Sequence, residues 1–244
     1  MKEGQIEGRN AVMEALRAGR EIDKILVAEG NKTLGAVIAL AKRRRIVVQT
    51  ADRRKIEAMA QTPVHQGVIA LCPAADYASV DDLLQLAQQR GEAPLLVVMD
   101  EITDPHNLGA VIRTASAAGA HGVIIPKHRS VGLNATVMKV SAGRAAHVKV
   151  AKVTNLAAAL RDLKEAGVWV AGADMHGSQP YTRADLRGPL ALVLGSEGKG
   201  ISRLVRETCD FLIHIPMAGT TESLNVSVAA GILLYEAVRQ RRGE

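Results

Sequence analysis

The sequence predicts an α/β protein with two domains, each a sheet covered by helices. Apolar strand-like runs alternate with helical patterns along all 244 residues. In the second half these runs are continuous, which is typical of parallel strands buried on both faces. Charge marks the boundary: residues 1–73 carry 13 Lys and Arg against 8 Asp and Glu, residues 74–93 carry 1 against 4, and residues 94–244 carry 17 against 13. We expect domains at 1–73 and 94–244, with a linker at 74–93.

The first domain is expected to be a small α/β sandwich. Asp52 is the expected cap of its last helix, because a carboxylate can accept the free N–H groups of a first turn. The expected helices are 8–18, 34–44 and 52–60, and the expected strands are 24–28, 46–49 and 67–72. The linker that follows contains one helical stretch at 80–89.

The second domain is expected to be a parallel sheet covered by helices on both faces. Its strands are expected at 95–100, 122–126, 168–173, 191–195 and 211–216. Its helices are expected at 108–118, 155–166, 201–208 and 225–242.

Three segments of this domain share one design, in which a strand leads through a polar or glycine-rich loop into a helix. They are DPHNLGAVIRTASAAGA at 104–120, LVLGSEGKGIS at 192–202, and the segment from 215 onward that contains TTESLNVSVAAG. Loops of this kind gather at the carboxyl ends of parallel strands, where ligands bind in open α/β sheets.

The first segment holds Asn107 and Arg113. Asn107 is expected to cap the helix. Arg113 lies beside Ile112 on a flank that should be buried, and a buried guanidinium needs a carboxylate or phosphate partner. Six helical residues leave the two side chains about 120° apart, so they converge only through a loop or the sheet edge. A helix cap at Asn107 and a structural ion pair of Arg113 would explain the two residues as well as a functional role does.

The other two segments offer polar groups within turns. GSEGKG matches neither the dinucleotide template nor the Walker template, but Gly195, Gly198 and Gly200 permit positive φ and close backbone approach. A tight turn with a surface ion pair is the plain alternative. In the third segment Ser223 and Asn225 flank Leu224, and Asn225 is also expected to cap the last helix.

Several classes are disfavoured. The seven His and two Cys lack metal-ligand spacing, so we expect no metal. Only five aromatic residues are present, too few for base stacking to dominate nucleic-acid binding. No apolar run reaches the roughly 18 residues of a membrane span, and we expect a soluble cytoplasmic protein. The net charge of +6 suits a polyanionic partner, although solubility alone explains it as well.

In order and at this spacing, the three segments resemble the motifs of the SpoU/TrmH branch of SPOUT RNA methyltransferases, over essentially the whole chain. Within that branch, GRNAV near the N-terminus and DPHNLGA followed by LNATVMKVSAGRA are most similar to 23S rRNA guanosine-2′-O-methyltransferases. The resemblance implies a deep trefoil knot in the second domain, a ribosomal-protein-like RNA-binding first domain, and a homodimer. It also implies S-adenosylmethionine as cofactor, held near Gly195, Gly198, Ile215, Met217 and Leu224.

The same resemblance implies methyl transfer to a ribose 2′-oxygen in 23S rRNA or a large-subunit precursor. It assigns Arg113 to the 2′-OH, and a guanidinium is so weak a base that we expect an electrostatic clamp. Asn107, Ser223 and Asn225 would orient Arg113 and the ribose, while Glu197 would order the second loop and pair with Arg113. The alternatives are a tRNA 2′-O-methyltransferase, a non-catalytic rRNA-binding assembly factor, and an enzyme that binds a small nucleotide.

Overall fold

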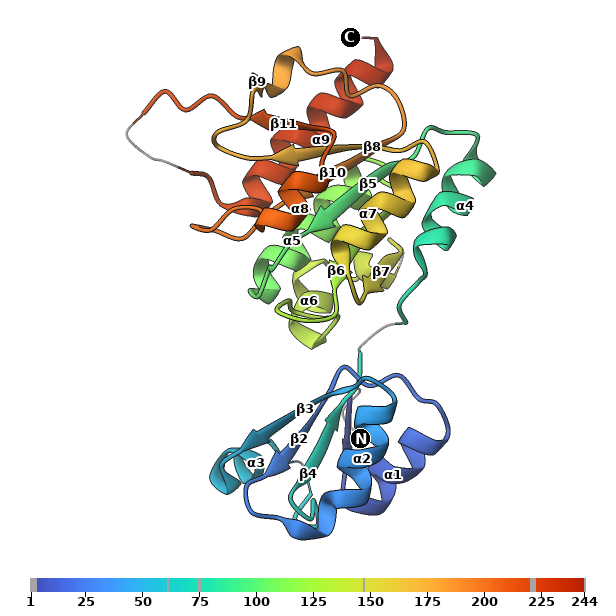
Figure 1. Ribbon diagram of the computed structural model, residues 1–244, viewed down its shortest axis with the longest axis vertical. Coiled ribbons are helices and arrows are strands. Elements are labelled where there is room, and N and C mark those ends of the chain that lie inside the picture. Colours follow the sequence, from blue (N-terminus) through green and yellow to red (C-terminus); the bar gives the residue numbers. More distant parts are fainter. Residues whose placement is uncertain (1–3, 61, 74–75, 147, 220–222, 244) are drawn as a thin grey trace. The chain divides into compact units, whose positions relative to one another are not determined.

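The computed structural model describes residues 4–60, 62–73, 76–146, 148–219 and 223–243. The chain divides into two compact units, Met1–Asp76 and Tyr77–Glu244 (Figure 1). Each unit has its own sheet and its own buried core.

The first unit is a four-stranded sheet with helices on both faces. Along the chain its elements are β1 (Gln5–Glu7), α1 (Arg9–Arg17), β2 (Lys24–Ala28), η1 (Lys32–Leu34), α2 (Gly35–Arg43), β3 (Val47–Ala51), α3 (Arg53–Met59) and β4 (Val68–Leu71), and the strand order is β1-β4-β2-β3. Strand β2 sends Ile25 and Val27 into a core with α1 and α2, and it sends Leu26 and Ala28 into a core with α3. This period of two places one helical layer on each face.

The sequence predicted these elements to within a few residues, and Asp52 caps α3 as expected, accepting from the N–H of Arg54 at 2.7 Å. Strand β1 was missed. It has only three residues, two of them polar, and it exists because it pairs with β4 at the sheet edge.

The second unit is a sheet of seven parallel strands. In spatial order they are β7 (Val150–Val153), β6 (Gly122–Pro126), β5 (Leu95–Met99), β10 (Leu190–Leu194), β8 (Trp169–Ala173), β11 (Phe211–His214) and β9 (Gln179–Pro180). Five of them were predicted. Strand β7 was missed because Lys152 interrupts its four residues, and β9 because it has only two residues.

Two helical layers cover this sheet (Figure 1). In one layer, helix α5 (Pro105–Ala117) packs against both α6 (Ala135–Val140) and α9 (Val226–Arg242). Helices α4 (Val80–Arg90), α7 (Leu156–Glu165) and α8 (Arg203–Thr208) share a core with alternate strand residues in the other layer. Two short 3-10 helices, η2 (Arg144–Ala146) and η3 (Tyr181–Arg183), complete the unit. No helix within the described ranges is long and apolar enough to cross a bilayer.

Helix α4 lies in the stretch expected to be a linker, but it belongs to the second unit. Its side chains of Leu83 and Ala87 are fully buried, and Leu83 packs so closely on β6 that a Cβ on Gly122 would lie 2.3 Å from it. Acidic composition therefore misled the prediction of the boundary, because Asp81 and Asp82 lie in the first turn of a packed helix and Asp76 and Glu92 lie just outside it. Ser79 and Asp82 form its capping box.

A buried histidine organises the amino edge of the sheet. His121 is 1% exposed, and its Nδ1 accepts from the N–H of Leu95 at 3.0 Å. Its Nε2 therefore carries the proton and donates to Glu92 at 3.0 Å. Burial lowers the pKa of His121 below 6.5, with the hydrogen bond to Glu92 opposing that shift. Nearby, the guanidinium of Arg241 donates to the carbonyls of Ala93, Pro94 and Gly188.

Candidate active site at the carboxyl edge of the sheet

The three motif loops meet at one edge of the second sheet. They follow β5, β10 and β11, and these strands are parallel, so their carboxyl ends point the same way. Helices α5, α8 and α9 start from these loops. This edge is where an open α/β sheet binds its ligands.

The loop after β10 is a tight turn closed on itself. The N–H of Ser196 donates to the carbonyl of Gly200 at 3.1 Å, and the N–H of Gly200 donates back to Ser196 at 2.8 Å. Gly198 and Gly200 have positive φ values of 80° and 65°, as the sequence suggested. A Cβ on Gly195 would lie 2.0 Å from the backbone carbon of Gly200, so only glycine fits there.

A buried carboxylate fixes the far end of this turn. Asp100 directly follows β5, is 4% exposed, and accepts from the N–H of Ser202 through Oδ2 at 2.7 Å. Ser202 is the N-cap residue directly before α8. Sequence reasoning treated Asp100 as the end of a strand, although an acidic residue directly after a buried strand is itself a signal.

Side chains from all three motifs join in one hydrogen-bonded cluster of Asn107, Glu197 and Asn225. The Nδ2 of Asn107 donates to Glu197 Oε1 at 3.0 Å. The Nδ2 of Asn225 donates to the same oxygen at 2.6 Å and to Asn107 Oδ1 at 2.8 Å. We call these three residues the amide–carboxylate cluster. Residues separated by up to 118 positions meet there, which local turn geometry alone would not require.

Asn225 caps α9 while it takes part in the cluster. Its Oδ1 accepts from the N–H and the hydroxyl of Ser227, at 2.9 and 2.6 Å. The expectation that Asn225 is the cap is confirmed. The same expectation for Asn107 is wrong, because α5 begins two residues earlier at Pro105 and its cap is Asp104. The amide of Asn107 is therefore available for the cluster.

Arg113 stands outside the cluster. The buried stripe of α5 consists of Leu108, Val111, Ile112 and Ala115. The 3.6-residue period of the helix turns position 113 away from this stripe, and Arg113 is exposed. The expectation of a buried Arg113 is thus wrong. Among the residues that the structure describes, no carboxylate pairs with Arg113, and the expected ion pair with Glu197 is replaced by the two amides.

The loop after β11 presents apolar side chains and open backbone. Ile215 and Leu224 are half-buried, Met217 is 39% exposed, and Ser223 is exposed. Over residues 215–219, the main-chain groups make no hydrogen bond to any other described residue. Thr220, Thr221 and Glu222 lie outside the described residues.

The edge thus combines a carboxylate, two amides and unpaired backbone groups, while Arg113 lies further along α5. Glu197 offers Oε2 to a ligand, because its two described hydrogen bonds both reach Oε1. Within the described residues, no group of three or more His, Cys, Asp or Glu side chains is placed to hold a metal ion. The arrangement can bind and orient a polar, hydroxyl-bearing ligand.

Comparisons with known proteins match both units. The sequence profile of the SpoU rRNA Methylase family matches residues 94–235. A second profile, described as RNA 2′-O ribose methyltransferase substrate binding, matches residues 5–78. The Bacillus subtilis protein YacO, whose name assigns it provisionally to the TrmH family tRNA/rRNA methyltransferases, is 50% identical over 236 residues, which is 96% of this chain and 94% of YacO.

Solved structures agree with this assignment. The SpoU methyltransferase AviRb from Streptomyces viridochromogenes, crystallised with the cofactor AdoMet, has a TM-score of 0.62 at 27% identity and covers 98% of this chain and 91% of its own. The AdoMet-bound rRNA methyltransferase of Sinorhizobium meliloti has a TM-score of 0.60 at 28% identity, with coverages of 97% and 87%. The matched profiles and these relatives show that the chain belongs to the SpoU/TrmH family of RNA 2′-O-methyltransferases.

Proposed function

We propose that the protein transfers a methyl group from S-adenosylmethionine to the 2′-oxygen of a guanosine ribose in bacterial 23S rRNA, as RlmB-type enzymes do. The observation that carries the proposal is the amide–carboxylate cluster, which unites Asn107, Glu197 and Asn225 from three distant loops. The names of the relatives support the chemistry, and the sequence resemblance to the guanosine enzymes supports the substrate.

The residues at the carboxyl edge fit S-adenosylmethionine. Adenine needs backbone donors and acceptors between apolar walls, and residues 215–219 offer unpaired backbone groups beside Ile215 and Leu224. Met217 is partly exposed next to them, and the turn at Gly195 and Gly198 keeps side chains out of the way. When bound, the cofactor would supply a methyl group already activated by its sulfonium, so the protein contributes mainly alignment.

Arg113 is proposed to clamp the RNA and to stabilise negative charge that develops on the 2′-oxygen. An exposed guanidinium without a described partner is free to bind an incoming phosphate. Asn107, Asn225 and the exposed hydroxyl of Ser223 would orient the ribose. Glu197 would position both amides and could accept a hydrogen bond from the sugar through its second oxygen.

The first unit is proposed to bind the RNA substrate. The side chains at 42–45 and 53–55 are exposed, and seven of these positions are Lys or Arg. Such groups hold a nucleic-acid backbone without reading its sequence. The match of residues 5–78 to a substrate-binding profile supports this assignment.

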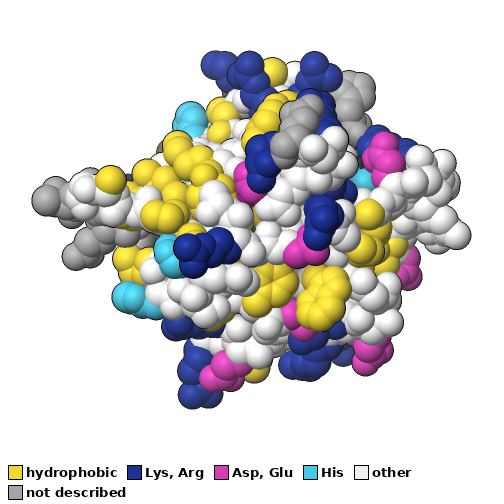
Figure 2. Space-filling model, turned by 90° about the horizontal axis from the view of Figure 1, so that it is seen from above, with side chains coloured by type: hydrophobic (Ala, Val, Ile, Leu, Met, Phe, Trp, Pro, Cys, Tyr) yellow, Lys and Arg dark blue, Asp and Glu magenta, His cyan; other side chains and the backbone are white. Residues whose placement is uncertain are grey.

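We further propose a cytoplasmic homodimer whose subunits meet along α9. Val228 and Tyr235 are 50% and 51% exposed, and seven residues on a helix bring them to one face. Figure 2 shows that hydrophobic side chains reach the surface on this face of the molecule, among Lys and Arg side chains. We also propose that the second unit contains a trefoil knot. Strand β10 lies between β5 and β8, so the chain follows a non-sequential path through the sheet.

A tRNA substrate is the second candidate, because the name of YacO leaves tRNA and rRNA open. Radiolabelled S-adenosylmethionine should be offered with unmodified 23S rRNA and, separately, with tRNA, and the product nucleotide mapped. Label at 2′-O-methylguanosine in 23S rRNA is expected. Label in tRNA alone would overturn the substrate, and binding of rRNA without label in either would favour an assembly factor.

Arg113→Ala tests the catalytic assignment directly. The variant should lose nearly all turnover, on the order of a hundredfold or more, because a preorganised charge at the reacting oxygen is removed. Its affinity for S-adenosylmethionine should match that of the wild type, since the proposed cofactor residues lie on other loops. A fully active Arg113→Ala protein would show that Arg113 has no such role.

A further inference from the structure

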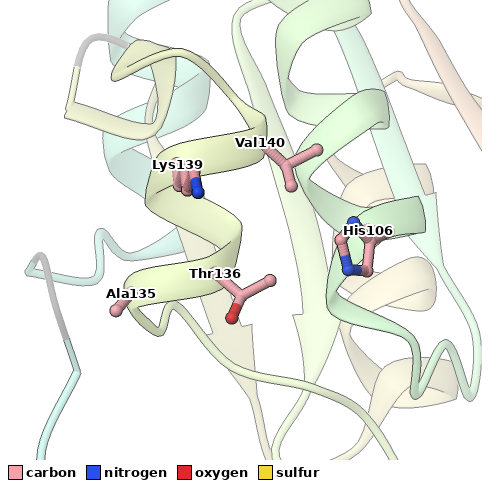
Figure 3. A pocket seen from close by; sticks show the side chains of 5 residues that line it. All are labelled: His106, Ala135, Thr136, Lys139 and Val140. Atoms are coloured by element: carbon pink, nitrogen blue, oxygen red, sulfur yellow. The ribbon is translucent and has the colours of Figure 1, made fainter.

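A cavity between α5 and α6 is not used by the proposed chemistry. It measures about 460 Å³ and is lined by His106, Ala135, Thr136, Lys139 and Val140 (Figure 3). The volume lies within the usual range for small-ligand sites.

The geometry of the two helices explains the opening. At Gly109 the helices touch, since a Cβ there would lie 2.8 Å from the Cβ of Val140. One turn before Gly109, His106 faces α6 across the cavity (Figure 3). Thr136, Lys139 and Val140 are spaced by three and four residues, so they share the face of α6 that lines the cavity.

The lining suits an anion. Lys139 brings a fixed positive charge with three donors, Thr136 a hydroxyl, and His106 a ring N–H. Within the described part of the chain, none of these three side chains makes a hydrogen bond or ion pair, and no carboxylate lines the cavity. The nearest acidic cap, Asp104, is exposed and accepts from the backbone N–H of His106 at 2.9 Å.

The cavity also lies next to the proposed reaction site. His106 and Asn107 are consecutive, and about 100° of helical rotation turns one toward α6 and the other toward the amide–carboxylate cluster. Arg113 follows His106 by seven residues and returns to the same face of α5, with a rise of about 10 Å. An RNA strand held by Arg113 can therefore reach the cavity within a few nucleotides.

We propose that this cavity binds a backbone phosphate of the RNA, flanking the ribose that is methylated, with Lys139 as its principal contact and His106 and Thr136 as further donors. The inference rests on the proposed function, because RNA is its ligand. A phosphodiester presents only acceptors and one negative charge, which complements this lining.

The test compares Lys139→Ala with Arg161→Ala, a control that removes an equally exposed charge from α7, in the opposite helical layer. RNA affinity is measured over a range of salt, alongside KM and kcat for methyl transfer. Lys139→Ala should weaken RNA binding roughly fivefold and reduce the salt slope by about 0.7–0.9, the share of one phosphate contact. KM should rise by the same factor with kcat unchanged, Lys139→Arg should restore affinity, and Arg161→Ala should resemble the wild type.

An unchanged affinity and salt slope in Lys139→Ala, or an equal loss in Arg161→Ala, would overturn the assignment. Because binding is measured without turnover, Lys139-dependent RNA binding by a protein that methylates no RNA would sustain the cavity and refute the proposed function. Methylation of RNA with the same KM and kcat in Lys139→Ala as in the wild type would sustain the proposed function and refute the role of the cavity. Inorganic phosphate that shifts the NMR signals of Thr136 and Lys139, without displacement by RNA, would assign the cavity to a small anion instead.

Discussion

Replacing Gly195 by alanine should damage the turn on which the amide–carboxylate cluster depends. The added methyl group would lie 2.0 Å from the backbone carbon of Gly200, 2.1 Å from its oxygen and 2.2 Å from the nitrogen of Ile201. All three atoms belong to the backbone, so no side-chain rotation relieves the contact. The turn must open, and Glu197 moves with it.

The magnitude follows from what the opening removes. Two reciprocal hydrogen bonds between Ser196 and Gly200 are lost, at about 1 kcal/mol each. Overpacking adds about 1–3 kcal/mol if the surroundings shift only in part. We expect the free energy of unfolding to fall by roughly 3–5 kcal/mol, which lowers Tm by roughly 6–20 °C for a unit of this size.

Thermal unfolding should be followed by circular dichroism and by the fluorescence of Trp169, the single tryptophan, which lies on β8 and reports on the second unit. Gly188→Ala is the matched control, because a Cβ there meets nothing within 4 Å. Gly195→Ala should also lose most methyl transfer, while the control keeps it. A Gly195→Ala protein as stable and active as Gly188→Ala would refute the close approach.

Two further residues allow equally direct tests. Asn225→Asp keeps the oxygen that accepts from the N–H of Ser227 and caps α9. It places a second carboxylate oxygen beside Glu197, where the amide of Asn225 donates at 2.6 Å in the wild type. Methyl transfer should therefore be lost while the α9 cap survives. Asn225→Ala should lose the cap as well, so its free energy of unfolding in urea should be about 1 kcal/mol lower than that of Asn225→Asp. Equal stability of the two variants would contradict this. Burial lowers the pKa of His121 below 6.5, so the unfolded chain binds that proton more tightly and stability should fall as the pH drops below about 6.5. His121→Asn, which can still accept from Leu95, should show a flatter Tm between about pH 7 and pH 5, and an unchanged profile would place the acid sensitivity elsewhere.

Local pattern predicted most of the fold because burial repeats with the period of each element. Continuous apolar runs located five of the seven strands of the second sheet, and capping chemistry located the starts of α3 and α9. The three missed strands are β1, β7 and β9. β1 and β9 are too short to show a period and Lys152 interrupts β7, and a neighbouring strand pairs with each of them. Composition placed α4 in a linker, whereas its buried face packs on the second sheet.

The candidate site divides in the same way. Sequence by itself determined which loops carry polar groups, that glycines shape the second loop, and that Asn225 caps a helix, because these features depend on neighbouring residues. Only the tertiary structure decided that Asn107 and Asn225 share one oxygen of Glu197 and that Asp100 holds Ser202. These hydrogen bonds join residues 28 to 102 positions apart, and their geometry is set by strand order and helix packing, which no local pattern encodes.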